Sequence, residues 1–431
     1  MPSLHSTLAR CGRAVIAAAG LLLLAGCNKI NFWRMDGHQS TIVVDGPVAR
    51  EQLDLFIVTC WVALVIFIVV GAVLAYATFK FRARSEDDEQ AAPPEQSHGN
   101  PLVELSLIVA SVLALVIIAI PTLKGIWNTY DVPEAEKKDA YSVNATGFQW
   151  WFRFEYPDEI VPMDATGSSK GPMVVANELV IPAGRAVRIQ LRTFDVIHSF
   201  WVPKLGGKVD MIPNRANHIY LKADKPGYYW GQCAEYCGDS HAVMRFRVVA
   251  LEAKEFADWL QNQARTGRTD ATGTEAVSPQ FAALRNFKAN EVGVTEAFDK
   301  SPLEAWRAKQ KPEAGENAAL IAKGRETFAK NSCGNCHSIR GHGAGGVTAP
   351  DLTHFGARTT LAGGLLENNE TQVRRWIHDP LAVKPGNKMH YGVGAMAGYM
   401  KKTEDGKGYT RNITLSADDE VALVAYLQSL K

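Results

Sequence analysis

The sequence has no excess of charge of either sign, since 46 lysines and arginines face 45 aspartates and glutamates. A chain so balanced has no strong field for nucleic acid or an acidic substrate, and we expect no nucleic-acid partner. Long apolar runs are absent beyond about residue 125, which excludes a transporter with many spans. Three apolar blocks before that residue exclude a simple cytosolic enzyme. At roughly 150 residues per domain, the 431 residues allow two or three domains.

Residues 1–26 are predicted to be an export signal. Arg10 and Arg13 precede an uncharged stretch that is too short to span a bilayer comfortably, which is the charge layout of a signal peptide. The stretch ends in Leu24-Ala25-Gly26-Cys27, which resembles a bacterial lipobox, in which the cysteine is acylated and becomes the first residue. Ordinary cleavage beside an incidental Cys27 is the alternative.

The segment 27–130 is predicted to hold a transmembrane hairpin with spans at about 55–79 and 102–123. At about 1.5 Å per residue, both apolar stretches are long enough to cross a hydrocarbon core of ~30 Å. Basic residues open the connecting loop and favour the cytoplasmic side for it, whereas an acylated Cys27 has to lie outside. We therefore expect everything after about Lys124 on the outer face.

Residues 131–262 are predicted to form an antiparallel β sandwich, because short β-rich runs alternate with turn residues and no long helix intervenes. One end carries a set of soft or borderline ligands that suits copper, namely His198, Cys233, Cys237, His241 and Met244. Two thiolates can bridge two copper ions and leave one histidine for each. A Cys233–Cys237 disulfide and a tetrahedral zinc site are the alternatives.

After a stretch at 263–315 that is predicted to be a linker, residues 316–431 are predicted to form an all-α domain that binds haem. Cys333-Gly-Asn-Cys336-His337 is the haem attachment signature, although the bare pattern can also mark a redox dithiol. The two thiols would bond the haem, and His337 would ligate its iron. A methionine opposite a histidine is a common ligand pair, which favours Met389, with Met396 and Met400 as competitors.

The copper pattern, His198 with Cys233-x-Glu235-x-Cys237-x-x-x-His241-x-x-Met244, resembles the binuclear CuA motif of cytochrome c oxidase subunit II. The hairpin and a cupredoxin-like β domain resemble that subunit over roughly residues 45–260, and the last domain resembles a class I cytochrome c. The resemblance implies CuA ligands at these residues, with Glu235 binding copper through its backbone carbonyl. It also implies that the Glu235 carboxylate reaches a magnesium ion shared with the catalytic subunit.

The resemblance implies roles for two further residues. Glu104 matches an acid at the mouth of a proton path, with a snorkelling or interfacial acid as the alternative. Trp150 matches the ring at which electrons enter, with core packing as the alternative. The neighbouring aromatic residues Phe148, Trp151 and Phe152 depart from the usual family pattern. Asp195 resembles part of an acidic rim for a donor protein, or is an ordinary exposed carboxylate.

The order of lipid anchor, hairpin, copper domain and haem domain indicates an electron relay. No cluster of histidines lies in either span, so the oxygen site has to belong to a partner. The resemblance is to the cytochrome c-fused subunit II of a bacterial haem–copper oxidase in the plasma membrane. It implies electron transfer from cytochrome c or another external donor to catalytic subunit I, which reduces dioxygen to water with proton pumping, in a complex with other oxidase subunits.

Two other functions stay open from the sequence alone. A CuA-type nitric oxide reductase shares much of this design, and a freestanding membrane-tethered copper and haem carrier would need no catalytic partner. The intact copper ligands argue against a subunit of a quinol oxidase.

Overall fold

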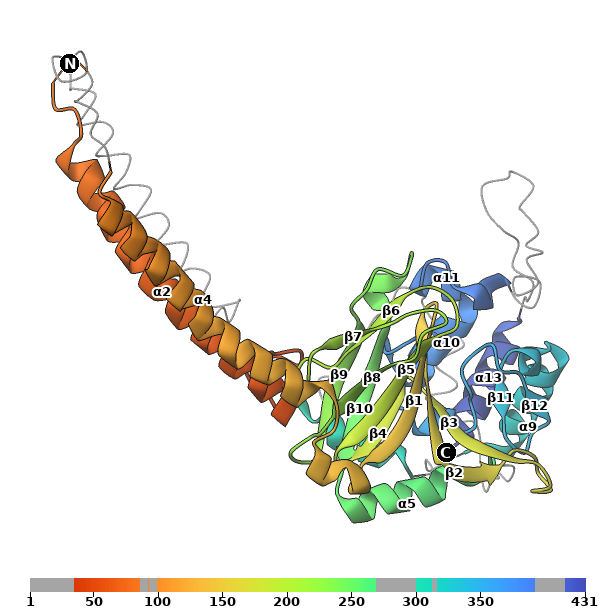
Figure 1. Cartoon of the computed structure of the whole chain (residues 1–431). Coiled ribbons are helices and arrows are strands. Elements are labelled where there is room, and N and C mark those ends of the chain that lie inside the picture. The colour runs from red at the N-terminus through yellow and green to blue at the C-terminus, as the bar shows by residue number, and fades with distance from the viewer. Residues whose placement is uncertain (1–34, 86–91, 93–98, 269–299, 312–315, 392–414) are drawn as a thin grey trace, which may run out of the picture.

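The computed structural model describes residues 35–85, 92, 99–268, 300–311, 316–391 and 415–431. The predicted signal 1–26, Cys27, Met396, Met400 and most of the predicted linker lie outside the described residues. The described chain forms a helical hairpin, a β sandwich and a C-terminal domain built mainly of helices (Figure 1).

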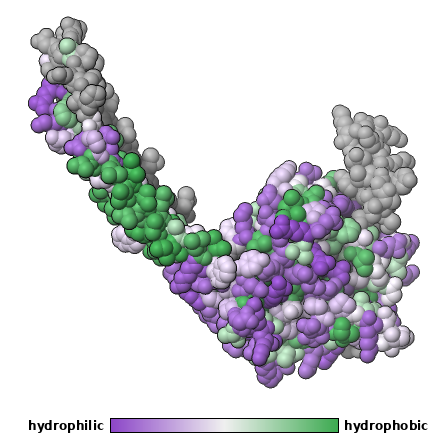
Figure 2. All heavy atoms as spheres, in the orientation of Figure 1, coloured by the Kyte–Doolittle hydropathy of each residue, from purple (hydrophilic) through white to green (hydrophobic). Residues whose placement is uncertain are grey.

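The hairpin consists of α2 (Pro47–Lys80) and α4 (Pro101–Tyr130), which lie side by side (Figure 1). Both are long and apolar enough to cross a membrane, and their apolar windows are not buried in the protein. Figure 2 shows hydrophobic side chains over much of the hairpin, in contrast to the polar surface of the domains. Unburied apolar surface of this extent needs lipid or a partner, which agrees with the predicted spans.

The helices are longer than the predicted spans because their outer ends continue onto the sandwich. Arg50 of α2 pairs with Asp224 at 2.7 Å, and Tyr220 donates to the carbonyl of Asn128 in α4 at 3.3 Å. A small apolar cluster joins the same parts and comprises Val48, Val132, Ala186 and Tyr220. These contacts fix the hairpin to the sandwich at the start of α2 and the end of α4.

The sandwich has two five-stranded sheets, with the orders β3-β2-β1-β5-β8 and β4-β10-β9-β6-β7. The strands are β1 (Tyr141–Phe148), β2 (Trp151–Pro162), β3 (Lys170–Ala176), β4 (Glu178–Pro182), β5 (Val187–Thr193), β6 (His198–Trp201), β7 (Lys208–Met211), β8 (Asn217–Leu221), β9 (Gly227–Cys233) and β10 (Arg245–Leu251). The predicted sandwich is confirmed. Its strands pair mostly antiparallel, but β1 with β5 and β4 with β10 run parallel, because β4 belongs to the second sheet and β5 returns to the first.

Buried and partly exposed side chains alternate along the strands, and the buried ones form the core between the sheets. On β2, Phe152, Phe154 and Tyr156 are fully buried while their neighbours are partly exposed, as the period of two requires. The first two rings contact Phe200 of β6 and Phe246 of β10 from the opposite sheet. The aromatic core thus lies directly below the end of the sandwich that carries the predicted copper ligands.

Two helices cover the sandwich, α5 (Ala253–Gln263) and α8 (Pro302–Lys309). Helix α8 falls within the stretch predicted to be a linker, yet Trp306 is buried in the sandwich core. Its indole N–H donates to Glu178 at 3.2 Å. Arg307 pairs through two bonds with Glu255 of α5, at 2.7 and 2.8 Å.

The C-terminal domain contains α9 (Ala318–Lys330), α10 (Glu370–His378), α11 (Pro380–Val383) and α13 (Ala417–Ser429). Two short hairpins complete it, β11 (Ser338–Ile339) with β12 (Ala344–Gly345) and β13 (Thr360–Leu361) with β14 (Leu366–Glu367). Helix α9 crosses α13 closely, since a Cβ at Gly324 would stand 2.0 Å from the carbonyl oxygen of Ala422. Short 3-10 helices lie before β1 at Glu134–Asp139 and between β9 and β10 at His241–Val243. Those of the C-terminal domain lie at Cys333–Asn335, Phe355–Ala357 and Lys388–Tyr391.

The C-terminal domain is docked on the sandwich beside β10. The amide of Arg245 donates to the carbonyl of Gly363 at 2.8 Å, and the guanidinium of Arg247 donates to Gly364 at 2.8 Å. Glu178, buried at the start of β4, accepts from the amide of Thr359 at 2.7 Å. A backbone bond and two buried charged side chains therefore join the two domains.

Candidate copper and haem sites

The predicted copper ligands meet because of how β6, β9 and β10 are placed. Strands β6 and β9 are antiparallel neighbours, with Phe200 opposite Cys233, which brings the start of β6 at His198 beside the end of β9. The loop between β9 and β10, which we name the copper loop, then returns over the same edge and carries Cys237, His241 and Met244.

The ligand atoms lie within a few ångströms of one another. The Sγ atoms of Cys233 and Cys237 are 3.8 Å apart. The Nδ1 of His198 is 3.9 Å from the Sγ of Cys233, and the Glu235 carbonyl oxygen is 3.2 Å from the same sulfur. The Sγ of Cys237 lies 3.6 Å from the Nδ1 of His241 and 3.8 Å from the Sδ of Met244.

These distances fit a soft-metal site. A disulfide needs sulfur atoms about 2 Å apart, so the two cysteines are free thiols here, which argues against the disulfide alternative. The donor set of two thiols, two imidazoles and one thioether matches the preference of copper. The Cys237 thiol donates to Cys233 and lowers the pKa of Cys233 to about 3, although burial opposes that shift. The same contact raises the pKa of Cys237. One proton is thus held between two sulfurs, and a bound metal would replace it.

Asp195 orients the first of the two histidines. Its Oδ1 lies 2.8 Å from the Nε2 of His198, and its other oxygen accepts from the amide of Gln149 at 2.8 Å. A proton on Nε2 leaves the lone pair of Nδ1 directed to Cys233, as is usual behind a metal-binding histidine. The sequence did not reveal this role, although a carboxylate three residues before a predicted ligand was a usable signal.

Trp150 is buried against the copper loop, with 6% of its surface exposed. Its indole N–H donates to the carbonyl of Cys237 at 3.0 Å, and Gln149 donates to the same oxygen at 2.8 Å. The ring therefore touches the backbone of a predicted copper ligand.

A cavity of about 240 Å³ lies between the sandwich and the C-terminal domain. Trp150 and Trp151 line it from the sandwich, and the C-terminal domain contributes all four predicted haem residues, namely Cys333, Cys336, His337 and Met389. The His337 Nδ1 lies 2.7 Å from the carbonyl of Pro350, which accepts its proton and leaves Nε2 for a metal. Burial lowers the pKa of His337 and so favours the neutral, ligating form.

The residues around this cavity fit a covalently bound haem. Two thiols, one imidazole with a free nitrogen and one thioether share a mostly apolar wall. Burial raises the pKa of Cys333 to about 11, so the unattached chain holds it as a thiol. Met389 is 41% exposed and belongs to a short turn, and the competing Met396 and Met400 lie outside the described residues.

The side chains of the other two predicted residues, Glu235 and Glu104, do not line the predicted haem cavity. Glu235 sits in the copper loop, and the one cluster of metal-binding side chains found among the described residues contains His198, Cys233 and Cys237 but no carboxylate. Glu104 lies exposed in the first turn of α4, near the end of the hairpin that is remote from the sandwich (Figure 1). An acid at that position also interacts favourably with the helix dipole.

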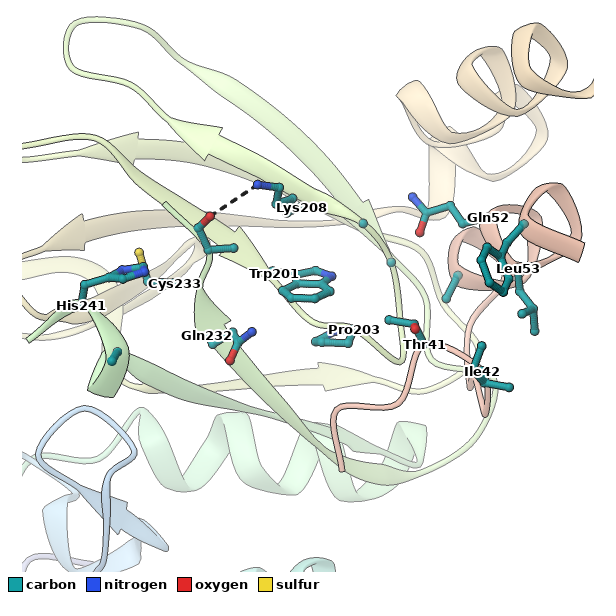
Figure 3. A pocket seen from close by; sticks show the side chains of 16 residues that line it. Thr41, Ile42, Gln52, Leu53, Trp201, Pro203, Lys208, Gln232, Cys233 and His241 are labelled. Atoms are coloured by element: carbon teal, nitrogen blue, oxygen red, sulfur yellow. Dashed lines mark hydrogen bonds between the residues drawn. The ribbon is translucent and has the colours of Figure 1, made fainter. Parts of the chain in front are cut away.

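Another cavity, of about 660 Å³, opens between α2 and the copper end of the sandwich. Figure 3 shows Gln52 and Leu53 on one side and Cys233 and His241 on the other, with Trp201 between them. Lys208 donates to the carbonyl of Ala234 at 3.4 Å at its edge. Two of the predicted copper ligands, Cys233 and His241, are therefore reached from the side on which the hairpin lies.

Comparisons with known proteins match both domains. Residues 141–251 match the family described as cytochrome C oxidase subunit II, periplasmic domain, and residues 321–431 match cytochrome c. The periplasmic domain of subunit II of cytochrome oxidase (CoxB) of Bradyrhizobium japonicum, a solved structure, is 37% identical over 28% of this chain and 92% of its own, with a TM-score of 0.24. A periplasmic-type domain after two apolar helices fits a membrane protein with an outward-facing domain.

Two curated relatives extend over most of the chain. Cytochrome c oxidase subunit 2 of Alkalihalophilus pseudofirmus is 32% identical over 415 residues, which cover 95% of this chain and 94% of the relative. Cytochrome c oxidase subunit 2 of Bacillus subtilis is 31% identical over 382 residues, which cover 85% of this chain and 88% of the relative. The chain therefore belongs to the family of cytochrome c oxidase subunit 2, the subunit through which electrons enter a haem–copper oxidase.

Proposed function

We propose that electrons from an external cytochrome c or a similar donor enter the C-terminal domain of this chain and leave it from the sandwich. The acceptor is the catalytic subunit I of the oxidase, which reduces dioxygen to water and pumps protons. The observation that carries the proposal is the position of Trp150, which lines the predicted haem cavity and donates to the carbonyl of Cys237 at 3.0 Å.

The side chains divide into two sets of ligands. Cys333 and Cys336 would bond the haem, and His337 and Met389 would ligate its iron. The predicted CuA ligands are His198, Cys233, the Glu235 carbonyl, Cys237, His241 and Met244. When bound, the two groups supply one-electron chemistry at fixed places in the chain. The protein's own contribution is to orient the imidazoles through Asp195 and Pro350 and to exclude water from both sites.

Trp150 is the residue through which electrons would reach the copper end of the sandwich. The docked C-terminal domain covers it, so an external protein cannot contact this ring directly. Electrons that reach Trp150 would therefore come from the chain's own C-terminal domain. A covalent tether also keeps that domain close at every turnover.

The hairpin and the cavity beside α2 support a membrane partner. Gln52 and Leu53 of α2 line this cavity together with Cys233 and His241, so it opens beside the exposed apolar surface of the hairpin, which suits docking of the catalytic subunit. At that boundary the Glu235 carboxylate would bind magnesium together with the partner. Glu104 would serve a proton path at the opposite end of the hairpin. Acylated Cys27 would anchor the chain after removal of residues 1–26, on the outer face of a bacterial plasma membrane.

Purification of the complex in mild detergent tests this function. We expect a large haem-bearing companion, oxygen consumption with reduced cytochrome c, a low-spin haem spectrum and a mixed-valence dicopper EPR signal. Cys233→Ser should abolish the copper signal and spare the haem spectrum, because only one bridging sulfur remains. Reduction of nitric oxide but not oxygen, or isolation of a lone chain, contradicts the oxidase assignment.

A further inference from the structure

Lys384 is a lysine buried between the two domains, with 2% of its surface exposed. Its Nζ donates to the carbonyl of Trp150 at 2.5 Å and to that of Ala362 at 2.9 Å. The first acceptor belongs to the sandwich and the second to the C-terminal domain. One ammonium group therefore holds together a wall of the predicted haem cavity and the loop that faces it.

Docking of the two domains buries this charge, so its protons need acceptors within the interface. No carboxylate pairs with Lys384 among the described residues, and burial lowers its pKa to about 7. A buried ammonium is tolerated only where its protons meet acceptors, and here the acceptors are two backbone carbonyls on opposite sides of the interface. Separation of the domains would remove one of them, so the two-sided bond exists only when the domains are docked.

The backbone around this contact is closely packed, as two glycines show. A Cβ at Gly363 would stand 2.5 Å from the Nζ of Lys384 and 2.9 Å from the Trp150 carbonyl. A Cβ at Gly386 would stand 2.6 Å from the Trp150 ring. Between these glycines, Ser240 of the copper loop donates to the carbonyl of Pro385 at 2.6 Å. The segment that leads to Met389 is thus fitted closely onto the copper end of the sandwich.

We propose that Lys384 is a positioning residue that fixes the C-terminal domain on the sandwich, so that the predicted haem cavity stays closed by Trp150. Holding two reacting groups in one geometry removes the search for a productive arrangement. The consequence for electron transfer rests on the function proposed above, whereas the docking itself does not.

Hydrogen exchange of the full-length protein in detergent tests the docking without reference to activity. The amides of Arg245 and Thr359 bond across the interface and report it directly. Lys384→Met keeps an apolar chain of similar length but leaves the Trp150 carbonyl without its donor, so exchange at both amides should rise about tenfold. Lys330→Met, which removes an exposed lysine from α9, is the matched control and should leave both amides protected.

A second variant reaches the same contact from the other side. Gly363→Ala should displace the ammonium through the added Cβ and give the same loss of protection, which decides the matter if Lys384→Met fails to fold. Gly343→Ala is its control, because Gly343 has nearly the same positive φ (+72° against +71°) but open space around an added Cβ, so it carries the backbone strain alone and should leave both amides protected. Core amides of β10 and α13 show that each domain is intact. Wild-type protection at Arg245 and Thr359 in a folded variant overturns the proposal.

In the assembled, fully loaded complex, Lys384→Met should slow the reduction of copper while the donor still reduces haem at the wild-type rate. Loss of both reductions together, with unchanged amide protection, would instead count against the positioning role. A wild-type protein that lacks copper or haem would refute the proposed function and leave the exchange result standing.

Discussion

At the scale of single residues, the copper end of the sandwich depends on partners that touch no metal. Asp195 holds the Nε2 of His198 at 2.8 Å and bonds the amide of Gln149, whose side chain in turn reaches Cys237. A single carboxylate therefore links the predicted ligands of β6 and the copper loop through the β1–β2 turn.

Asp195→Ala should weaken copper binding by about ten- to a hundredfold, because His198 loses the acceptor that fixes its tautomer and orientation. Competition of the purified protein with a copper chelator measures this change. Asp158→Ala, an exposed carboxylate on β2, is the control and should bind copper like the wild type. Equal affinity in both variants would mean that Asp195 has no part in the site.

The sequence predicted which soft side chains lie together, but it predicted little of their surroundings. Cys233, Cys237, His241 and Met244 are close in sequence, so one loop brings them together. Lys384 could not be singled out in the same way, because a lysine is normally exposed and only tertiary packing shows otherwise.

At the scale of elements, α8 shows how a stretch without a motif can be structural. Helix α8 packs Leu303 and Ala305 against the sandwich core beside Trp306, which is 3% exposed and reaches across to Glu178. The partner is 128 residues away, so no local pattern could have indicated the contact. The parallel pairs β1–β5 and β4–β10 were missed for the same reason, since alternation predicts a strand but not its neighbour.

Trp306→Ala should destabilise the protein by about 3–5 kcal/mol, because it empties a packed site and removes the indole donor to one carboxylate oxygen of Glu178. Trp306→Phe keeps most of the packing and loses the hydrogen bond to a buried carboxylate, at a cost of about 1–3 kcal/mol. Denaturant unfolding measures both values. Similar small losses for the two variants would show that α8 is not held by this ring.

The pair between Arg307 and Glu255 should make the attachment of α8 sensitive to acid. The bidentate bond to Arg307 lowers the pKa of Glu255 from its ordinary 4.5, so its stabilisation is complete above that pH. The stabilisation is lost as the pH falls through the lower pKa of the folded state. Both side chains are about one-third exposed, which limits the effect to about 1 kcal/mol or less. The difference in unfolding free energy between wild type and Arg307→Gln should therefore be present at pH 7 and vanish in acid, and a difference that persists in acid would contradict this account.

At the scale of the whole molecule, the docking of the C-terminal domain decides how the two predicted sites are connected. The sequence indicated the order of the parts but gave no information on whether the last domain docks or moves freely. The contacts that answer this join residues far apart, such as Thr359 with Glu178 and Lys384 with Trp150, which lie 181 and 234 positions from each other. Their effect is to place Trp150 in the wall of one site and against the backbone of the other.

The most direct test of this arrangement is rapid-mixing reduction of the purified complex by its donor, with haem and copper followed by their separate absorbance. The account predicts that haem is reduced first, at a rate proportional to donor concentration. Copper should follow at a rate that does not change when more donor is added. Copper reduction that accelerates with donor concentration and does not wait for haem would show that electrons reach the copper site without passing through the C-terminal domain, which would contradict the account.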